Sequence, residues 1–155
     1  MAGAELSELE ALYRQRFPHF VRVATALLRD EDRAVEAVQE AFAAAVRARR
    51  SFRREGALEA WVWRMVVNEA RKTKRFAGEP LDDSAAAPAT EESSPIRTAI
   101  AQLPERQRLA LFLRYYADLD YRSIAAVLEV SPGTVGASLN AAHATLRRLL
   151  QEVQQ

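Results

Sequence analysis

The sequence predicts an all-α protein made of two small helical domains joined by a flexible acidic linker. Ala, Leu, Arg and Glu are good helix formers and abundant, whereas the 155 residues include only 5 Gly and 6 Pro. Apolar residues, 49% of the chain, recur at the spacing of amphipathic helices. One proline-containing, purely acidic stretch interrupts this pattern, and a chain of this length can form two small domains.

The first domain, residues 1–75, is expected to form three or four helices. Apolar side chains between residues 6 and 27 follow helical spacing, although Pro18 is expected to bend that helix or split it. Acidic residues at 30–32 suit the start of a second helix, because negative charge stabilises a helix N-terminus. Apolar residues then line one side of this second helix as far as Val46.

A third helix over about 57–75 is predicted to have one apolar and one cationic face. The apolar stripe consists of Leu58, Trp61, Val62, Met65 and Val66. The opposite face carries Arg64, Asn68, Arg71, Lys72, Lys74 and Arg75. Cations beside an amide can track phosphates and read a base edge. Asn is a poor helix-interior residue, so Asn68 either caps a local irregularity or contacts a base.

The net charge of +1 conceals a marked asymmetry along the chain. Residues 47–75 hold 10 basic and 3 acidic side chains, whereas residues 76–95 hold 5 acidic side chains and no basic one. Residues 76–95 also contain three prolines and cannot bury enough apolar surface to fold, so they are predicted to be the linker. The basic block is either a solvated face or a nucleic-acid footprint.

The second domain, residues 96–155, is predicted to contain a helix-turn-helix. A short helix ended by Pro104 and a longer helix come first. The run from 121 to 135 then reads as two helices around a tight turn. Ser131 is a good N-cap for the later helix, and Pro132 suits its first position, where a missing N–H costs nothing. An ordinary helical hairpin would show the same periodicity, whereas a helix-turn-helix would place its second helix in a DNA major groove.

Composition argues against several other kinds of site. The absence of cysteine excludes disulfides and thiolate metal sites, and the two histidines, His19 and His143, are too isolated to suggest a metal centre. There is no nucleophile–base constellation and no phosphate-binding glycine loop, so we expect no enzyme, no cofactor and no metal. No apolar stretch reaches the ~20 residues of a membrane span, and the acidic N-terminus lacks the features of a signal peptide. We therefore expect a soluble cytoplasmic protein.

Several short motifs, in their order and spacing, resemble those of the extracytoplasmic-function (ECF) sigma factors of bacterial RNA polymerase. The resemblance runs from about Leu12 to Leu150. Strings similar to region 2 of that family lie at 12–17, 37–42 and 60–68. Strings similar to its region 4 lie at 103–108, 113–116, 121–128 and 130–135. Each string is weak alone, but their order and the intervening linker are together specific.

The resemblance implies core RNA polymerase and promoter DNA as partners and an anti-sigma factor as a regulator. Region 2 would bind the coiled-coil clamp of the β′ subunit and capture the melted −10 element. Region 4 would dock on the flap of the β subunit and read the −35 element as duplex. The polymerase-binding positions carried over from the family are Glu36, Gln39 and Glu40.

The resemblance also implies that the loop from Arg47 to Gly56 accepts a flipped base. The positions assigned to −10 DNA are Arg50, Phe52, Arg53, Arg54, Trp63, Arg64, Asn68, Arg71 and Lys72. Cations, stacking rings and amides are the groups that bind single-stranded DNA. Trp61 lies on the apolar stripe and is expected in the core, whereas Trp63 lies off that stripe and is the better candidate for an exposed contact.

The second helix of the helix-turn-helix departs from the family pattern, which carries several cations there. Residues without positive charge stand at those positions, namely Gly136, Ser138, Ala141 and His143. The positions assigned to the −35 element are Arg122, Ser131, Thr134, Ser138, Asn140 and Arg147. Because each phosphate contact adds a salt-dependent increment of affinity, we expect weak or atypical −35 reading and promoter choice that rests more on region 2.

Two other functions fit parts of the sequence. A stand-alone helix-turn-helix regulator would bind duplex DNA as a dimer, but it would need a basic recognition helix. A decoy sigma paralogue would bind polymerase or an anti-sigma factor without productive promoter recognition, and the cation-poor helix is compatible with that. The preferred interpretation is a non-catalytic initiation subunit that recruits core polymerase to promoters and helps to open them.

Overall fold

A computed structural model describes residues 3–76 and 94–154 of the chain. The secondary structure in these two stretches is helical, which confirms the predicted fold class. The chain falls into two compact units, residues 1–81 with 126–129 and residues 82–125 with 130–155. Nearly all of the predicted linker lies outside the described residues. Among the helices that the structure describes, none is both long enough and apolar enough to cross a membrane.

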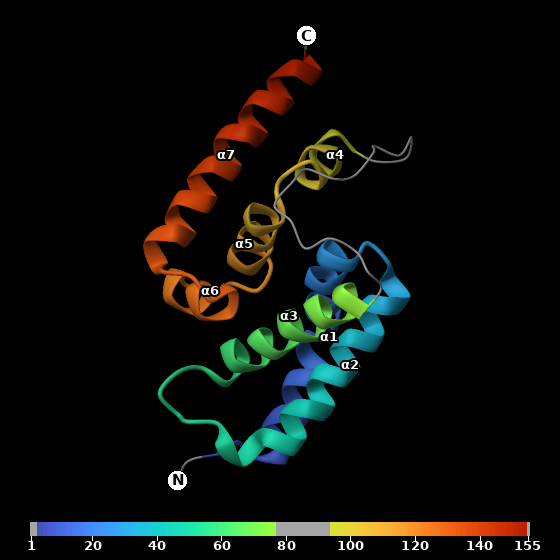
Figure 1. The fold of residues 1–155 in the computed structure, drawn as a ribbon, viewed down its shortest axis with the longest axis vertical. Coiled ribbons are helices and arrows are strands. Elements are labelled where there is room, and N and C mark those ends of the chain that lie inside the picture. Colours follow the sequence, from blue (N-terminus) through green and yellow to red (C-terminus); the bar gives the residue numbers. More distant parts are fainter. Residues whose placement is uncertain (1–2, 77–93, 155) are drawn as a thin grey trace. The chain divides into compact units, whose positions relative to one another are not determined.

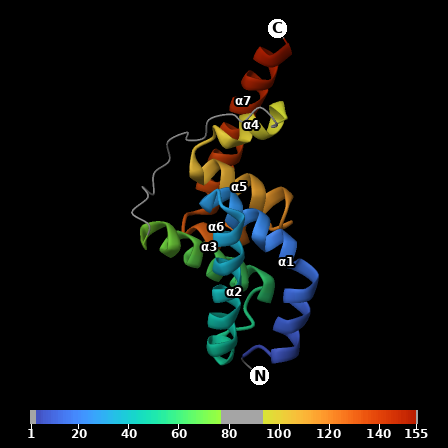
Figure 2. The same cartoon turned by 90° about the vertical axis from the view of Figure 1, so that its right-hand side faces the viewer.

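The first unit is a three-helix arrangement with a short 3-10 helix after its second helix (Figure 1). Its elements are α1 (Leu6–Leu28), α2 (Glu31–Ala48), η1 (Arg49–Ser51) and α3 (Leu58–Phe76). Figure 2 shows α1 and α2 running in opposite directions, and each of the three α-helices packs against the other two. Asp30 caps α2, because its carboxylate accepts a hydrogen bond from the backbone N–H of Arg33 at 3.2 Å.

Pro18 lies inside α1 and does not split it. A proline in a helix interior removes one backbone donor, and the expectation of a bend or a split rested on that cost. Packing offsets the cost here, because Leu9 on one side of Pro18 and Phe20 and Val23 on the other are almost wholly buried. The helix instead ends at Arg29, whose positive φ of 58° terminates the helical hydrogen bonding.

Aromatic rings form the centre of the first unit. The Phe20 ring lies 5.3 Å from that of Phe42 in an edge-on geometry and 4.2 Å from that of Trp63, measured between centroids. Each of the three rings comes from a different helix, and all three are buried. These contacts fix the rotation of α3 about its own axis and therefore decide which of its side chains face solvent.

The second unit is built on four helices. These are α4 (Pro95–Ala101), α5 (Glu105–Tyr115), α6 (Tyr121–Leu128) and α7 (Pro132–Gln154). The long helix α7 packs against both α4 and α5. Arg108 is buried on α5 and donates a hydrogen bond to the carbonyl oxygen of Leu103 at 2.7 Å, so it satisfies the backbone where the chain turns between α4 and α5.

Helices α6 and α7 form the predicted helix-turn-helix. Asp120 caps α6 by accepting a hydrogen bond from the backbone N–H of Ser123 at 2.8 Å, and that bond lowers the pKa of the Asp120 carboxyl. Glu129 provides the turn with a positive φ of 58°. Ser131 accepts from the backbone N–H of Thr134 at 3.1 Å, and α7 begins at Pro132, so the predicted N-cap and first helical residue are confirmed.

Candidate nucleic-acid interface

The cationic face predicted for α3 is present. Asn68 is exposed, as are the cations Arg64, Lys72 and Arg75, whereas Arg71 and Lys74 are half-buried. Val62, Val66 and Ala70 are buried on the opposite side of the helix. Because α3 runs without interruption through Asn68, this residue does not cap an irregularity. The structure therefore brings one amide and several cations together on a surface open to solvent.

Trp63 was assigned to this surface, and that assignment is wrong, because its side chain is fully buried against Phe20. The Trp63 indole N–H donates to a carboxylate oxygen of Glu59 at 3.1 Å, which satisfies its one polar atom. Trp61, expected in the core, is only half-buried. The error has a physical cause. Two neighbouring helices pack on α3, so its buried arc is centred between Val62 and Trp63 and is rotated away from the predicted stripe.

The segment from η1 to the start of α3, residues 49–57, is named the 49–57 loop. It contains three of the cations assigned to −10 DNA, Arg50, Arg53 and Arg54, and all three are exposed. Phe52, assigned to −10 DNA as one of its stacking rings, is only 3% exposed, and the centroid of its ring lies 5.3 Å from that of Trp61. Phe52 therefore anchors the loop to α3 and does not offer a free ring face.

The third of these cations, Arg54, is bound to the N-terminal part of the chain. Its guanidinium donates to both carboxylate oxygens of Glu8, with the longer of the two contacts at 3.3 Å. The Arg54 guanidinium, followed by the backbone N–H of Glu5, lowers the pKa of Glu8, and Glu8 in turn raises the pKa of Arg54. Arg54 also lies over the ring of Phe52 at 5.8 Å.

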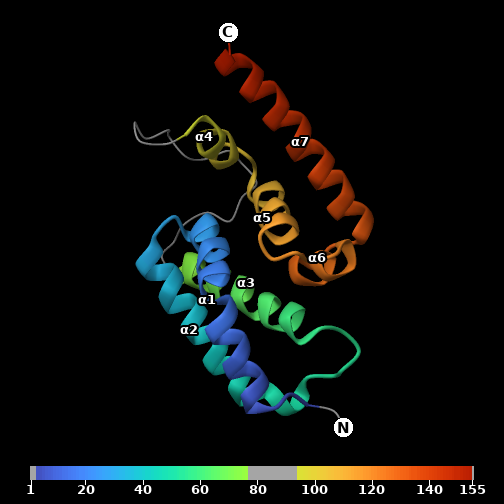
Figure 3. The ribbon, with the colours of Figure 1, turned by 180° about the vertical axis from the view of Figure 1, so that it is seen from behind.

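Backbone hydrogen bonds join the same two segments. The N–H of Gly3 donates to the carbonyl oxygen of Phe52 at 2.8 Å, and the N–H of Ala4 donates to that of Arg49 at 2.7 Å. Figure 3 shows the N-terminal segment beside the end of α2, where the chain enters the 49–57 loop. Sequence reasoning did not find Gly3, Ala4 or Glu8, because the only signal is a glycine near the N-terminus and an acidic residue on a helix.

The polymerase-binding positions Glu36, Gln39 and Glu40 are all exposed on α2. Two of them, Glu36 and Glu40, lie one helical turn apart and border a polar hollow of about 230 Å³ between α2 and α3. Glu40 also pairs with Arg47 at 3.5 Å. The three side chains are accessible to a partner, and a surface of this kind presents carboxylates to a basic one.

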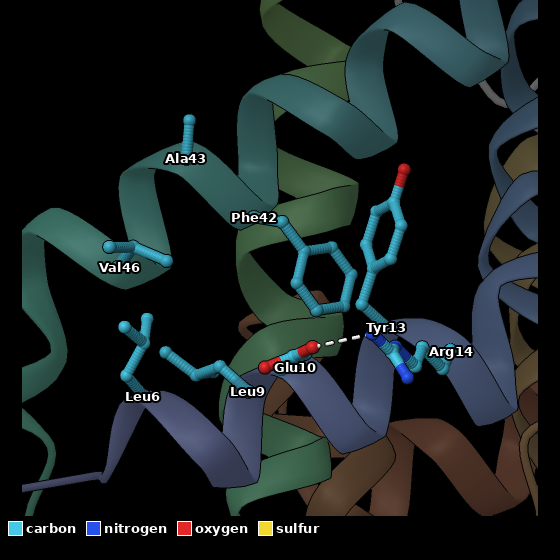
Figure 4. A pocket seen from close by; sticks show the side chains of 8 residues that line it. All are labelled: Leu6, Leu9, Glu10, Tyr13, Arg14, Phe42, Ala43 and Val46. Atoms are coloured by element: carbon cyan, nitrogen blue, oxygen red, sulfur yellow. Dashed lines mark ion pairs between the residues drawn. The ribbon is translucent and has the colours of Figure 1, made fainter.

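An apolar groove of about 500 Å³ lies between α1 and α2. Its lining residues are Leu6, Leu9, Glu10, Tyr13, Arg14, Phe42, Ala43 and Val46. Figure 4 shows the rings of Tyr13 and Phe42 at one end of the groove, and they meet edge-on with their centroids 5.0 Å apart. Glu10 and Arg14 form an ion pair of 2.8 Å along the edge of the groove.

The positions assigned to −35 DNA are only partly brought together. Ser131 and Thr134 share a hydrogen bond of 2.9 Å at the start of α7, and Ser138 follows one turn after Thr134. Asn140 is exposed. Arg147 is also exposed but lies about 20 Å further along the helix than Thr134, at the usual rise per residue, so it belongs to a different part of α7.

Tyrosines stand beside the cation-poor part of α7. A Cβ atom added at Gly136 would lie 3.5 Å from the Tyr121 ring, so that ring packs directly on the helix backbone at this glycine. The Tyr115 hydroxyl and the His143 ring nitrogen Nε2 are 3.1 Å apart. Two of the four positions at which cations were expected, Gly136 and His143, are therefore in contact with aromatic side chains of α6 and α5.

Comparison with known proteins assigns both units to families. Residues 12–78 match the family described as Sigma-70 region 2, and residues 93–151 match Sigma-70, region 4. The ECF RNA polymerase sigma factor SigM of Mycobacterium tuberculosis is 31% identical over 91% of this chain and 76% of its own length. The chain belongs to the ECF sigma factors. The RNA polymerase sigma-H factor of Pseudomonas aeruginosa is 30% identical over 79% of this chain and 75% of its own length.

Solved structures support the fold of this sigma factor. The sigma factor RpoE of Bartonella quintana, solved with the anti-sigma factor NepR, superposes with a TM-score of 0.73 at 24% identity. That match covers 94% of this chain and 98% of the other. CnrH, solved with the cytosolic domain of CnrY, superposes with a TM-score of 0.72 at 20% identity over 96% of this chain and 91% of its own.

The sigma factor acts in promoter-specific transcription initiation, as the predicted function states. The region 2 match begins at residue 12 and extends over most of α1 and all of α2 and α3. Gly3, Ala4 and Glu8, which contact the 49–57 loop, therefore precede the matched region. The region 4 match spans α4 to α6 and nearly all of α7.

Proposed function

We propose that this sigma factor captures the melted −10 element with the 49–57 loop and the exposed face of α3. The observation that carries the proposal is the joint exposure of Asn68 with Arg64, Lys72 and Arg75. Such a surface can follow the phosphates of a single strand while an amide contacts a base edge. With Trp63 and Phe52 buried, this binding relies on cations and amides more than on stacking by those two rings.

Core polymerase binds, on this proposal, to the exposed face of α2 that carries Glu36, Gln39 and Glu40. The support is their accessibility together with the carboxylates that they offer to a basic surface. The chain then acts as a non-catalytic subunit of the polymerase in the cytoplasm. An anti-sigma factor regulates it. The support is that one structural neighbour, RpoE, was solved with the anti-sigma factor NepR, and the other, CnrH, with the cytosolic domain of CnrY.

The second unit makes weak contact with the −35 element. The residues available at the start of α7 are small hydroxyl and amide side chains, and Ser131 and Thr134 already bond to each other. The start of α7 carries no cation, so it gains little from phosphate contacts.

Size exclusion of the purified protein with bacterial core RNA polymerase tests the proposed partner. We expect co-elution, and we expect the double substitution Gln39→Ala, Glu40→Ala to weaken binding by about tenfold or more, as truncation near the centre of an interface does. Glu31→Ala, an exposed carboxylate at the start of the same helix, is the matched control and should bind as the unaltered protein does. Folded protein that does not bind would refute the proposal.

A further inference from the structure

We propose that residues 3–8, the N-terminal brace, hold the 49–57 loop in the conformation that reads the −10 element. Glu8 is the positioning residue of this brace and acts through Arg54. The inference rests on the proposed role of the loop in −10 capture. It assigns a function in promoter reading to residues that precede the part of the chain matched to region 2.

The first connection between brace and loop is made by the backbone. The bonds from Gly3 to Phe52 and from Ala4 to Arg49 attach consecutive residues of the brace to both ends of η1. Gly3 has a φ of 103°, a conformation that other residues rarely adopt. A Cβ atom at this position would also lie 3.3 Å from the Cα of Arg50. Glycine is therefore required both by the backbone conformation and by the close approach to the loop.

The second connection is the bidentate ion pair between Glu8 and Arg54. A carboxylate oxygen of Glu8 also accepts a hydrogen bond from the backbone N–H of Glu5 at 3.0 Å, within the capping box that begins α1. Glu8, in the first turn of α1, therefore joins the N-cap of that helix to Arg54 of the 49–57 loop. The planar guanidinium fork of Arg54 fixes orientation as well as distance.

The 49–57 loop gains order from these external contacts. Two described backbone hydrogen bonds lie within the loop. The N–H of Phe52 donates to the carbonyl oxygen of Arg49 at 3.4 Å, and the N–H of Glu55 donates to that of Arg53 at 2.7 Å. A loop held by few bonds of its own loses conformational freedom when it closes around a base, and that loss weakens binding. External bonds that order the loop beforehand reduce this cost and favour the strand that fits.

Substitution of Glu8 tests the proposal, because a positioning role and a purely electrostatic role predict opposite changes in DNA affinity. Removing a carboxylate near a DNA-binding loop reduces repulsion of phosphate, so Glu8→Gln by itself should leave DNA affinity unchanged or raise it. If Glu8 positions the loop, the same substitution lowers affinity for the −10 sequence. Glu10→Gln is the matched control, because Glu10 loses the same charge on the same helix but pairs with Arg14 instead of the loop (Figure 4).

The experiment uses holoenzyme assembled from the full chain and core RNA polymerase. The probe is a fluorescent single-stranded oligonucleotide that carries the −10 sequence mapped for the unaltered protein, and a scrambled strand is the reference. We expect Glu8→Gln to lower the preference for the −10 strand about three- to fivefold, the size of effect of a well-formed surface ion pair. Gly3→Ala should act in the same direction, and Glu10→Gln should have no effect. In an Arg54→Gln background, Glu8→Gln should cause no further loss.

Amide hydrogen exchange on the same full-chain variants provides a readout that does not depend on DNA. We expect faster exchange at Gly3, Ala4 and Phe52 in Glu8→Gln, with exchange in the buried part of α2 unchanged. An unaltered −10 preference in Glu8→Gln, or an equal loss in Glu10→Gln, would overturn the brace while leaving the proposed function intact. Absence of any −10 preference in the unaltered holoenzyme would overturn both.

Discussion

At the scale of single residues, Trp63 shows how one side chain can fix what a helix presents to solvent. Its ring is fully buried between helices, and its indole nitrogen is bonded to Glu59. Burial of this ring turns the cations of α3 outward, so Trp63 supports the proposed DNA surface without touching DNA. A substitution here should therefore act through stability.

We predict that Trp63→Ala destabilises the first unit by about 3–5 kcal/mol, because it removes a large buried ring and leaves a cavity. Trp63→Phe retains most of the ring volume and should cost less. Chemical denaturation followed by circular dichroism measures both effects, and Arg75→Ala, on the exposed side of the same helix, serves as the control. A stable, fully folded Trp63→Ala that fails to bind −10 DNA would contradict the structural role of Trp63 and would indicate that it contacts DNA.

At the scale of helices, residue patterns predicted where a helix lies in the sequence better than which of its sides is buried. The start of α7 followed from Ser131 and Pro132, because capping depends on residues that are adjacent in sequence. The buried arc of α3 did not follow, because the stripe containing Trp61 is amphipathic on its own and only packing by two neighbouring helices selects the arc. Continuity of α1 through Pro18 was likewise decided by tertiary burial.

The contacts of the 49–57 loop lay beyond sequence reasoning for a related reason. The pair of Glu8 with Arg54 joins residues 46 positions apart, and nothing local in the sequence connects them. The loop itself was recognised by resemblance, whereas the contribution of Phe52 was misjudged, because an aromatic residue in a loop can either stack on a base or anchor the loop. Only the packing of its ring against Trp61 decides between these two roles.

Gly136 on α7 permits a prediction about the cation-poor helix. A Cβ atom there would be in ordinary contact with the Tyr121 ring, so alanine should fit and should stabilise the helix by about 0.5–1 kcal/mol. Gly136→Lys should combine a similar gain with an added phosphate contact. We expect tighter binding of duplex DNA by the holoenzyme and a salt dependence steeper by about one unit of log affinity per log salt.

Gly136→Ala is the control that separates helix propensity from charge in this experiment. It should raise the thermal stability of the protein while leaving duplex affinity and its salt dependence unchanged. Equal effects of alanine and lysine on DNA binding would show that the helix was limited by its flexibility and not by its lack of cations.

At the scale of the whole molecule, the two units offer different chemical groups for contact with promoter DNA. The first offers an exposed amide with several cations and a braced loop, whereas the start of α7 in the second offers hydroxyl and amide groups. Composition and helical periodicity were enough to predict the all-α class, and the turn and cap residues around Ser131 indicated the helix-turn-helix, because all of these are local patterns. They could not assign the strength of DNA contacts, which depends on which side chains remain exposed after packing.

This difference in exposed groups predicts how much the −10 and −35 elements each contribute to promoter strength. Electrostatic contacts provide much of the affinity for DNA, and the 49–57 loop with α3 carries more exposed cations than the start of α7. We therefore expect transcription by the holoenzyme to fall further when the −10 element of a mapped promoter is replaced than when its −35 element is replaced. The measurement is run-off transcription from three templates that differ only in those elements.

The salt dependence of transcription from the same templates tests whether a lack of phosphate contacts in the second unit is the cause. If the second unit contributes few phosphate contacts, replacing the −35 element should leave the slope of initiation against salt nearly unchanged, and Gly136→Lys should make the unaltered −35 element matter more. A promoter that loses most of its activity when the −35 element is replaced would contradict the prediction. It would mean that Ser131, Thr134 and Asn140 read the duplex through hydrogen bonds to bases strongly enough to replace the missing charges.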